Sequence, residues 1–167
     1  GKYTNEMSLA NGCDWCNPGA YSKEFVDVHG GAKTFVCLPC APGTFAERPG
    51  QTSCDSCAEG RYLEVSGSST CSFCWVGSYQ TASGETACIE CSAGHALPEL
   101  WTTMQQINIK GILDWVPVLG SGSVDACGCD KGARTNEGGE CVKGSEGLLC
   151  IGMGYFEIQE GYYSDTA

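Results

Sequence analysis

The sequence is poor in the aliphatic residues that build an ordinary hydrophobic core, and it is also poor in charge. Only 17% of its 167 residues are charged, and its 24 glycines outnumber leucine, isoleucine or valine. Such a chain cannot bury enough apolar surface to offset its conformational entropy, and small secreted domains meet that deficit with covalent crosslinks. The 14 cysteines can supply those crosslinks. We therefore expect an oxidising compartment, extracellular or lumenal, and not the cytosol.

Basic residues are scarce. Nine Lys and Arg stand against 20 Asp and Glu, which gives a formal net charge of -11. Nucleic-acid binding needs clustered basic side chains to neutralise phosphates, so this composition argues against a nucleic-acid partner. A protein partner with a basic surface fits the charge better. Thinly spread acidic residues are, however, also a common solubility device.

Long apolar runs and processing signals are absent as well. The longest apolar candidate, residues 111–124, is interrupted by Asp114 and Pro117, so we expect no membrane span in this chain. The first residues lack a signal-peptide pattern and read as an interior or processed end. No Asn-X-Ser/Thr glycosylation acceptor occurs, because Asn17 precedes proline.

Catalytic patterns are missing too. The two histidines, His29 and His95, lie in glycine-rich contexts without a second metal-ligand pattern nearby. The chain contains no GxSxG or SxxK nucleophile motif and no GxGxxG or GxxxxGK phosphate loop. We predict that the chain is not an enzyme and binds no cofactor or metal.

A cysteine repeat is the main feature that is present. Five CxxC pairs occur, and the last four begin 17 residues apart: Cys13/Cys16, Cys37/Cys40, Cys54/Cys57, Cys71/Cys74 and Cys88/Cys91. A glycine follows each second cysteine by three residues, an aromatic residue follows four of them by five, and a second glycine precedes the next pair at Gly50, Gly67 and Gly84. A fixed period of this kind predicts a modular array.

Each recurring residue has a physical role in the repeat. The first glycine permits a turn with positive φ, and the aromatic ring can cover the neighbouring disulfide and supply a small apolar core. The second glycine marks a turn that returns the chain to the next cysteine. Each repeat is therefore interpreted as a two-stranded finger closed by one crosslink.

The period allows two regular disulfide schemes. We favour the one in which the second cysteine of each pair joins the first of the next: Cys16–Cys37, Cys40–Cys54, Cys57–Cys71 and Cys74–Cys88. Each of the last three loops then contributes about 3 kcal/mol by restricting the unfolded chain. The rival scheme joins first to first and second to second across neighbouring pairs. A zinc array, in which CxxC thiolates bind the metal, is a minor alternative.

The spacing CxxCxxGx followed by Tyr or Phe resembles the ephrin-receptor-like cysteine-rich repeat, a relative of tumour-necrosis-factor-receptor and furin-like modules. The resemblance covers about residues 13–96 and includes CLPCAPGTFAERPGQTSC, CDSCAEGRYLEVSGSSTC and CSFCWVGSYQTASGETAC. The first unit departs from the family pattern through an insertion between Tyr21 and Val36. The resemblance implies extracellular or lumenal protein interaction, with no catalytic residues.

Residues 92–126 interrupt the period and hold the most apolar content. Alternation over Gln106–Lys110 predicts a strand, and residues 112–116 predict a second strand after a turn near Gly111. We expect this hairpin to pack Trp101 and Trp115 against the last repeat. The alternative is that these tryptophans form an exposed contact site for a partner.

The C-terminal region carries two further resemblances. The stretch CGCDKGARTNEGGEC is similar to the C-terminal half of an EGF module, which implies Cys129–Cys141 and Cys91–Cys127 pairs; it lacks a calcium loop. From Trp101 onward the chain resembles a segment of very large modular proteins of dinoflagellate algae, in which Gly144 is replaced by cysteine and Ile151 by proline. Cys13 and Cys150 are then left without an assigned partner. We expect residues 144–163 to form a strand, a turn and a strand.

The predicted fold is small and disulfide-rich, mostly irregular with short β hairpins, in an elongated array followed by a small β/EGF-like module. Its predicted segments are a lead (1–12), repeats (13–36, 37–53, 54–70, 71–87, with a fifth from 88, together 13–91), a hairpin segment (92–126) and the EGF-like, glycine-rich module (127–167). The predicted function is non-catalytic protein interaction or scaffolding, and the alternative is an accessory subunit on the lumenal face of a membrane complex such as an algal photosystem, in the thylakoid lumen. The exposed face between the aromatics is the expected contact surface: Glu47, Arg48, Glu64, Gln80 and Glu85.

Overall fold

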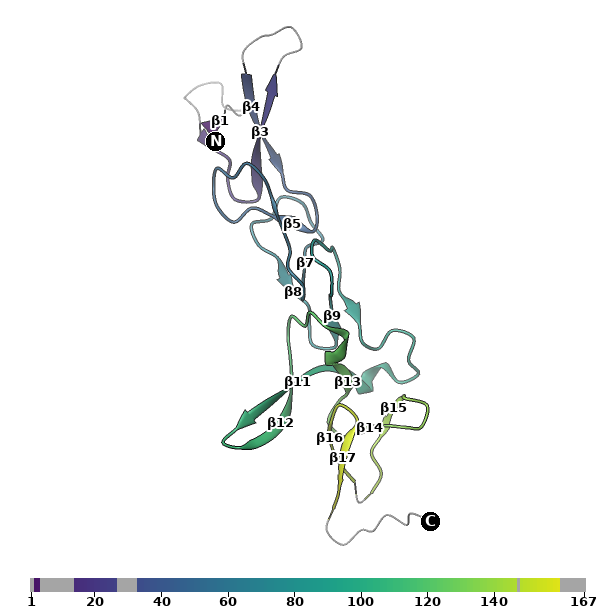
Figure 1. The fold of residues 1–167 in the computed structure, drawn as a ribbon. Helices are drawn as coiled ribbons and strands as arrows, with labels where there is room; N and C mark the ends of the chain where they lie inside the picture. Colours follow the sequence, from purple (N-terminus) through teal and green to yellow (C-terminus); the bar gives the residue numbers. More distant parts are fainter. Residues whose placement is uncertain (1, 4–13, 27–32, 147, 160–167) are drawn as a thin grey trace. The chain divides into compact units, whose positions relative to one another are not determined.

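The computed structural model describes residues 2–3, 14–26, 33–146 and 148–159 as short antiparallel strands joined by turns (Figure 1). Two short 3-10 helices complete the described part, η1 (Pro98–Leu100) and η2 (Val124–Ala126). Six disulfides and many two-stranded hairpins confirm the predicted small disulfide-rich β fold. Cys13, His29 and the last residues of the predicted segment 144–163 lie outside the described residues.

The chain divides into two units. Unit 1 comprises Gly1–Ser72 and Ala82–Ala87, and unit 2 comprises Phe73–Thr81 and Cys88–Ala167. Strands β1 to β8 pair as consecutive hairpins: β1 (Lys2–Tyr3) with β2 (Asp14–Trp15), β3 (Ala20–Val26) with β4 (Lys33–Pro39), β5 (Thr44–Phe45) with β6 (Asp55–Ser56), and β7 (Arg61–Tyr62) with β8 (Ser72–Phe73). The insertion in the first repeat forms the longest of these hairpins, β3–β4.

Unit 2 contains the later strands. Their pairs are β9 (Ser78–Tyr79) with β10 (Ile89–Glu90), β14 (Ala133–Thr135) with β15 (Cys141–Lys143), and β16 (Leu148–Gly152) with β17 (Tyr155–Ile158). A three-stranded sheet has the order β12-β11-β13, from β11 (Trp101–Ile109), β12 (Ile112–Pro117) and β13 (Cys127–Cys129). The hairpin predicted around residues 106–116 is confirmed, with its turn at Lys110–Gly111.

Disulfides occupy the interior of both units. Each joins the second cysteine of one pair to the first cysteine of the next: Cys16–Cys37, Cys40–Cys54, Cys57–Cys71, Cys74–Cys88, Cys91–Cys127 and Cys129–Cys141. The second cysteines Cys16, Cys40, Cys57, Cys74 and Cys129 are fully buried. Phe45 packs against the next repeat's cluster of Cys57, Leu63 and Cys71, so an aromatic ring does cover a neighbouring disulfide.

A repeated set of backbone hydrogen bonds links successive repeats of unit 1. The amide of each turn glycine donates to the carbonyl of the preceding repeat's second cysteine, at 2.8 Å in all three cases: Gly50 to Cys16, Gly67 to Cys40 and Gly84 to Cys57. A second hydrogen bond also recurs. The amide of the residue six places after that cysteine donates to the carbonyl of the residue that follows the turn glycine. The three pairs are Ser22 to Gln51, Ala46 to Ser68 and Leu63 to Glu85. These bonds satisfy backbone groups that the two-residue strands leave unpaired.

The same register continues in unit 2, although the 17-residue period has ended. The amide of Gly120 donates to the carbonyl of Cys74 at 2.8 Å, and the amide of Gln80 donates to the carbonyl of Ser121 at 3.0 Å. Gly120 therefore takes the place of a turn glycine. The hairpin β11–β12 is thus an insertion into the loop that Cys91–Cys127 closes.

Repeats also touch at second-neighbour distance, through glycine. A Cβ built on Gly43, at φ +78°, falls on the carbonyl oxygen of Gly84, and one built on Gly19 falls on that of Gly67. Gly94 also has positive φ, at +84°, but no atom lies within 4 Å of its Cβ position. The first two glycines are therefore required by packing as well as by turn geometry.

Gly43→Ala and Gly94→Ala form a matched pair that separates packing from backbone strain. Gly94→Ala is expected to cost about 1 kcal/mol, the penalty of the left-handed region alone. Gly43→Ala is expected to cost roughly 2 kcal/mol more, because the methyl group meets backbone that must shift. Thermal unfolding of the oxidised proteins measures both, and equal losses would contradict the close approach.

Cys150 is a buried free cysteine beside a glycine. Gly144 follows Cys141 by three residues, so it stands where a CxxC pair would have its second cysteine. A Cβ on Gly144 lies 3.8 Å from the Cβ and 2.6 Å from the Sγ of Cys150. Disulfides have Cβ–Cβ separations near 3.8 Å. The Cβ separation thus suits a further crosslink once the Cys150 sulfur rotates away from its present position 2.6 Å from that Cβ.

Gly144→Cys is expected to form a disulfide with Cys150, with a small shift of the Gly132 carbonyl that lies 3.1 Å from the new Cβ position, and to add about 2 kcal/mol of stability. Peptide mapping without reduction checks the bond, and thermal unfolding checks the stability. The control is Gly138→Cys in an exposed turn, which should leave both thiols titratable. Free thiols in the oxidised Gly144→Cys protein would contradict the inferred geometry.

Candidate interaction surfaces

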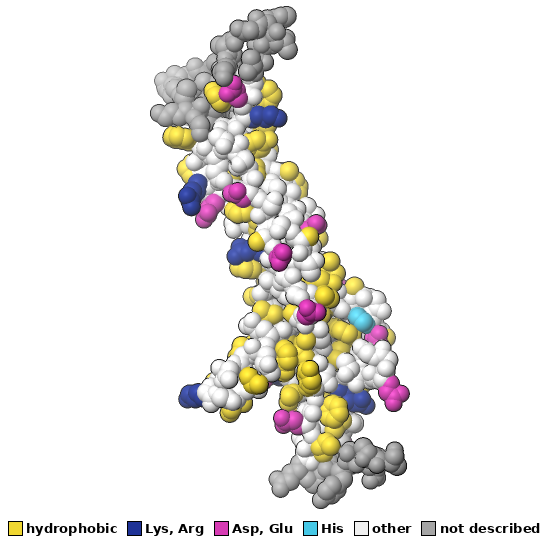
Figure 2. Space-filling model, viewed as in Figure 1, with side chains coloured by type: hydrophobic (Ala, Val, Ile, Leu, Met, Phe, Trp, Pro, Cys, Tyr) yellow, Lys and Arg dark blue, Asp and Glu magenta, His cyan; other side chains and the backbone are white. Residues whose placement is uncertain are grey.

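Among the residues that the structure describes, exposed apolar side chains are concentrated in unit 2. In the described part of unit 1 the large exposed hydrophobic residues are Trp15, Phe25 and Val65, whereas in unit 2 they are Phe73, Trp75, Val76, Ile89, Leu97, Ile109, Ile112, Leu113, Leu119, Val124, Leu149, Tyr155, Phe156 and Ile158. Figure 2 shows hydrophobic side chains gathered around β16 and β17. Apolar surface of this extent marks interaction sites on proteins of this size.

The most exposed apolar element is the end of the β11–β12 hairpin, which extends away from the other strands of unit 2 (Figure 1). We call Ile109, Lys110, Gly111, Ile112 and Leu113 the hairpin tip. Lys110 and Gly111 have φ of +54° and +90°, as a tight two-residue hairpin turn requires. Ile109, Ile112 and Leu113 are 53%, 71% and 60% exposed. Ile109 and Ile112 are cross-strand partners on one face of the hairpin and Leu113 lies on the other, so the tip displays aliphatic side chains on both faces.

The base of this hairpin is held firmly. The hydroxyl of Thr103, a fully buried residue, donates to the carbonyl of Val118 at 2.8 Å and accepts from the amide of Gly77 at 2.9 Å. The ring of Trp115 stacks on Tyr155, with centroids 6.1 Å apart and planes at 11°. The tip is thus presented from a fixed base, which lowers the entropy cost of binding.

Asp114 caps the free edge of β12. Because the two-residue turn closes on Ile109 and Ile112, the amide of Trp115 faces the outer edge of the sheet. The carboxylate of Asp114 accepts from that amide at 2.8 Å and from the Nζ of Lys131 at 3.0 Å. The hydrogen bond from Lys131 is the largest cause that holds the pKa of Asp114 below its ordinary value of 3.8. A charged, capped edge resists pairing with another strand, so the hairpin is available through its tip and faces.

Trp101 occupies a different environment from Trp115. Its half-buried ring packs on the cluster of Cys129, Ala133 and Cys141 and stacks on His95, with centroids 3.8 Å apart. His95 Nδ1 lies 3.0 Å from a carboxylate oxygen of Glu140. The structure therefore places Trp101 inside the C-terminal part of unit 2, and this stack ties the turn at His95 to the loop before Cys141.

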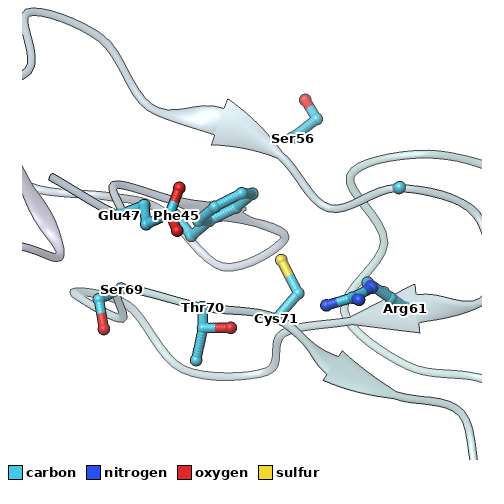
Figure 3. A pocket seen from close by; sticks show the side chains of 8 residues that line it. Phe45, Glu47, Ser56, Arg61, Ser69, Thr70 and Cys71 are labelled. Atoms are coloured by element: carbon cyan, nitrogen blue, oxygen red, sulfur yellow. The ribbon is translucent and has the colours of Figure 1, made fainter.

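Unit 1 has a groove between its second and third repeats (Figure 3). This hollow of about 420 Å³ is lined by Phe45, Glu47, Ser56, Ala58, Arg61, Ser69, Thr70 and Cys71. Phe45 and Glu47 come from one side, and the guanidinium of Arg61 is directed toward it from the other (Figure 3). A second hollow of about 310 Å³ shares Glu47 and adds Arg48, Gln51 and Asp55. We call the two hollows together the groove.

The contact face predicted from the sequence is only partly brought together. Glu47 and Arg48 line the groove, and Glu64 and Glu85 are exposed. Gln80 is 5% exposed, so its expected place on an exposed face is wrong. It is buried because the backbone bond from its amide to Ser121 draws it under the loop that follows the inserted hairpin.

Two functional features escaped the sequence reasoning. The hairpin tip was predicted as strand and turn, but the exposure of Ile109, Ile112 and Leu113 needs the three-dimensional fold. The groove has no comparable signal in the sequence, because Ser56 and Ala58 align with Phe73 and Trp75, and both of these are exposed in the next repeat.

Metal and membrane features can be stated for the described part of the chain. No group of three or more His, Cys, Asp or Glu residues there could hold a metal ion, and twelve cysteines are disulfide-bonded and hence are not thiolates for zinc. Within the same ranges, no helix has the length and apolar character needed to cross a bilayer.

Comparison with protein families identifies the repeats. The family described as tyrosine-protein kinase ephrin type A/B receptor-like matches residues 29–70 and 60–105. Over residues 29–105 the chain is therefore similar to ephrin-receptor-like cysteine-rich repeats, a non-catalytic type of extracellular interaction module stabilised by disulfides. Among curated proteins, none matches the chain. The crosslinks and the family together assign the chain to an extracellular or other oxidising compartment.

The lowered pKa of Asp114 predicts an acid-sensitive hairpin. A carboxyl whose folded pKa is depressed stabilises the fold above its unfolded pKa, and that contribution is lost as pH falls through the lower folded value. The Trp115 amide resonance should therefore shift below about pH 4. Asp114→Asn should abolish that shift. A Trp115 amide that titrates identically in both proteins would contradict the capping role.

Proposed function

We propose that this chain is a binding or scaffold segment whose hairpin tip inserts into an apolar hollow on a partner protein. The observation that carries the proposal is the exposure of Ile109, Ile112 and Leu113 on a rigidly held insertion. Stable monomers rarely leave such residues together in water. In repeat proteins, insertions are also common on the binding face.

The disulfide framework supports this role. Because Gly120 and Cys91–Cys127 keep the ends of the loop in the register of the other repeats, the hairpin is added without disturbing the array. The residues of the hairpin tip, unlike the buried Thr103 and Met104 at its base, are therefore under little demand from folding. Side chains that serve neither core nor solubility are best explained by a partner.

Charge indicates the chemistry of that partner. The chain has a net charge of -11, while the tip itself carries only Lys110. We therefore expect an apolar hollow on the partner that contains an acidic group, to pair with Lys110, and that is surrounded by basic residues, to match the net negative charge of the chain. Opposite charge around such a contact raises the association rate and selects against wrong partners.

The test uses the whole oxidised chain, immobilised and exposed to the extracellular or lumenal fraction of its source. The double variant Ile112→Ser/Leu113→Ser should lose a stoichiometric partner that the unmodified chain retains, with affinity reduced at least tenfold when the purified pair is measured. The loss follows from the apolar area that the tip no longer buries. Val65→Ser, which removes a residue of similar exposure in unit 1, is the matched control.

Equal binding by the double variant and the unmodified chain would overturn the assignment of the tip. Loss of partner binding in both the double variant and Val65→Ser would also contradict this assignment, because such a result indicates non-specific apolar adhesion. Unchanged disulfide maps in all proteins exclude misfolding as the cause.

A further inference from the structure

We propose that the groove in unit 1 binds a neutral, polyhydroxylated ligand, a sugar unit of an oligosaccharide. The site is separate from the hairpin tip and does not depend on the proposed protein partner. It is defined by the two hollows that meet at Glu47.

Two small residues, Ser56 and Ala58, help to line the first hollow, which has a volume of about 420 Å³, within the range of small-molecule sites. The repeat framework does not fix residue size at these two positions, because Phe73 and Trp75 hold them one period later, where both are exposed.

The charges of the groove balance. Glu47 and Asp55 contribute two carboxylates, and Arg48 and Arg61 contribute two guanidinium groups. A phosphate-bearing ligand would need an excess of cations, and a cationic ligand would need an excess of carboxylates. A neutral ligand is therefore favoured.

The polar atoms of the groove both donate and accept. Carboxylates accept, guanidinium groups donate, and the hydroxyls of Ser56, Ser69 and Thr70 do both. Gln51 is fixed between its neighbours, because its Nε2 donates to Asp55 at 3.0 Å and its Oε1 accepts from the Arg48 amide at 2.9 Å. Sugar hydroxyls, which also donate and accept, match this mixed set better than ligands with acceptors alone.

Phe45 supplies an apolar wall. Its ring is half-buried against the Cys57, Leu63 and Cys71 cluster, so it is held in place while one part remains exposed in the groove. The face of an aromatic ring carries partial negative charge and attracts the slightly positive C–H groups on one side of a sugar ring. The second hollow allows a ligand longer than one ring to continue past Glu47.

The experiment is a heteronuclear NMR titration of the whole oxidised chain with the methyl glycosides of glucose, galactose and mannose and with N-acetylglucosamine. At least one should give saturable shifts at Phe45, Glu47 and Arg61, with a dissociation constant of about a millimolar for so open a site. Binding is then compared between a neutral N-glycan attached to a protein and the same glycan released from it. Tighter binding of the attached form indicates a glycoprotein ligand, and equal binding indicates a free oligosaccharide.

Ala58→Trp is the decisive variant, because it places a large side chain on the wall of the first hollow, at a position where the next repeat already has Trp75. It should weaken sugar binding at least tenfold and leave the disulfide map unchanged. Trp75→Ala, at the aligned position, should bind as the unmodified chain does. If Ala58→Trp perturbs the fold, Glu47→Gln combined with Arg61→Gln tests the same hydrogen bonds and should also weaken binding.

Absence of saturable shifts with all of these sugars would overturn the proposal. It would also be overturned if Ala58→Trp bound as well as the unmodified chain, or if inorganic phosphate or a lysine-containing peptide produced the groove shifts while the sugars did not.

Discussion

The disulfide between successive repeats is the interaction on which the rest of this structure depends. Fully buried residues include Cys16, Cys40, Cys57 and Cys74, whereas Leu63 is the one Leu, Ile or Val side chain among the buried residues of the described chain. Strands of two residues cannot hold a register by themselves. The crosslinks fix where each repeat begins, and the backbone bonds from the turn glycines to the cysteine carbonyls then align each repeat on the previous one.

A framework of this kind separates stability from function. Because each loop is closed covalently, residues between the cysteines are free to vary in length and chemistry. The chain uses this freedom twice, at β3–β4 and at β11–β12. The same freedom lets the small residues Ser56 and Ala58 stand where the next repeat has the exposed Phe73 and Trp75, without loss of the repeat. The interaction surfaces therefore lie where the framework makes the fewest demands.

Much of the fold follows from the sequence because the repeat encodes it locally. Spaced cysteines predict a disulfide-rich array, and the predicted turn glycines Gly43, Gly50, Gly60 and Gly67 all have positive φ. The hairpin at residues 106–116 follows from alternation and a glycine at its turn. These features depend on neighbours within a few residues, which a single sequence displays.

Other features depend on contacts between residues that are distant in sequence, which the 17-residue period does not reveal. Gly120 acts as a turn glycine although the inserted hairpin moves it out of the 17-residue spacing, and this also explains why Gln80 is buried. Asp114, which caps the edge of β12, also accepts a hydrogen bond from Lys131, which is distant in sequence. Such placements arise from the folded loop and have no local signature.

The central claim is that sulfur–sulfur bonds take the place of an apolar core. Amide hydrogen exchange at Cys57 and Leu63, followed before and after complete reduction at constant pH, tests it most directly. The account predicts slow exchange in the oxidised protein and exchange at the rate of an unfolded chain once the thiols are free. Protection that persists in the reduced protein would contradict it.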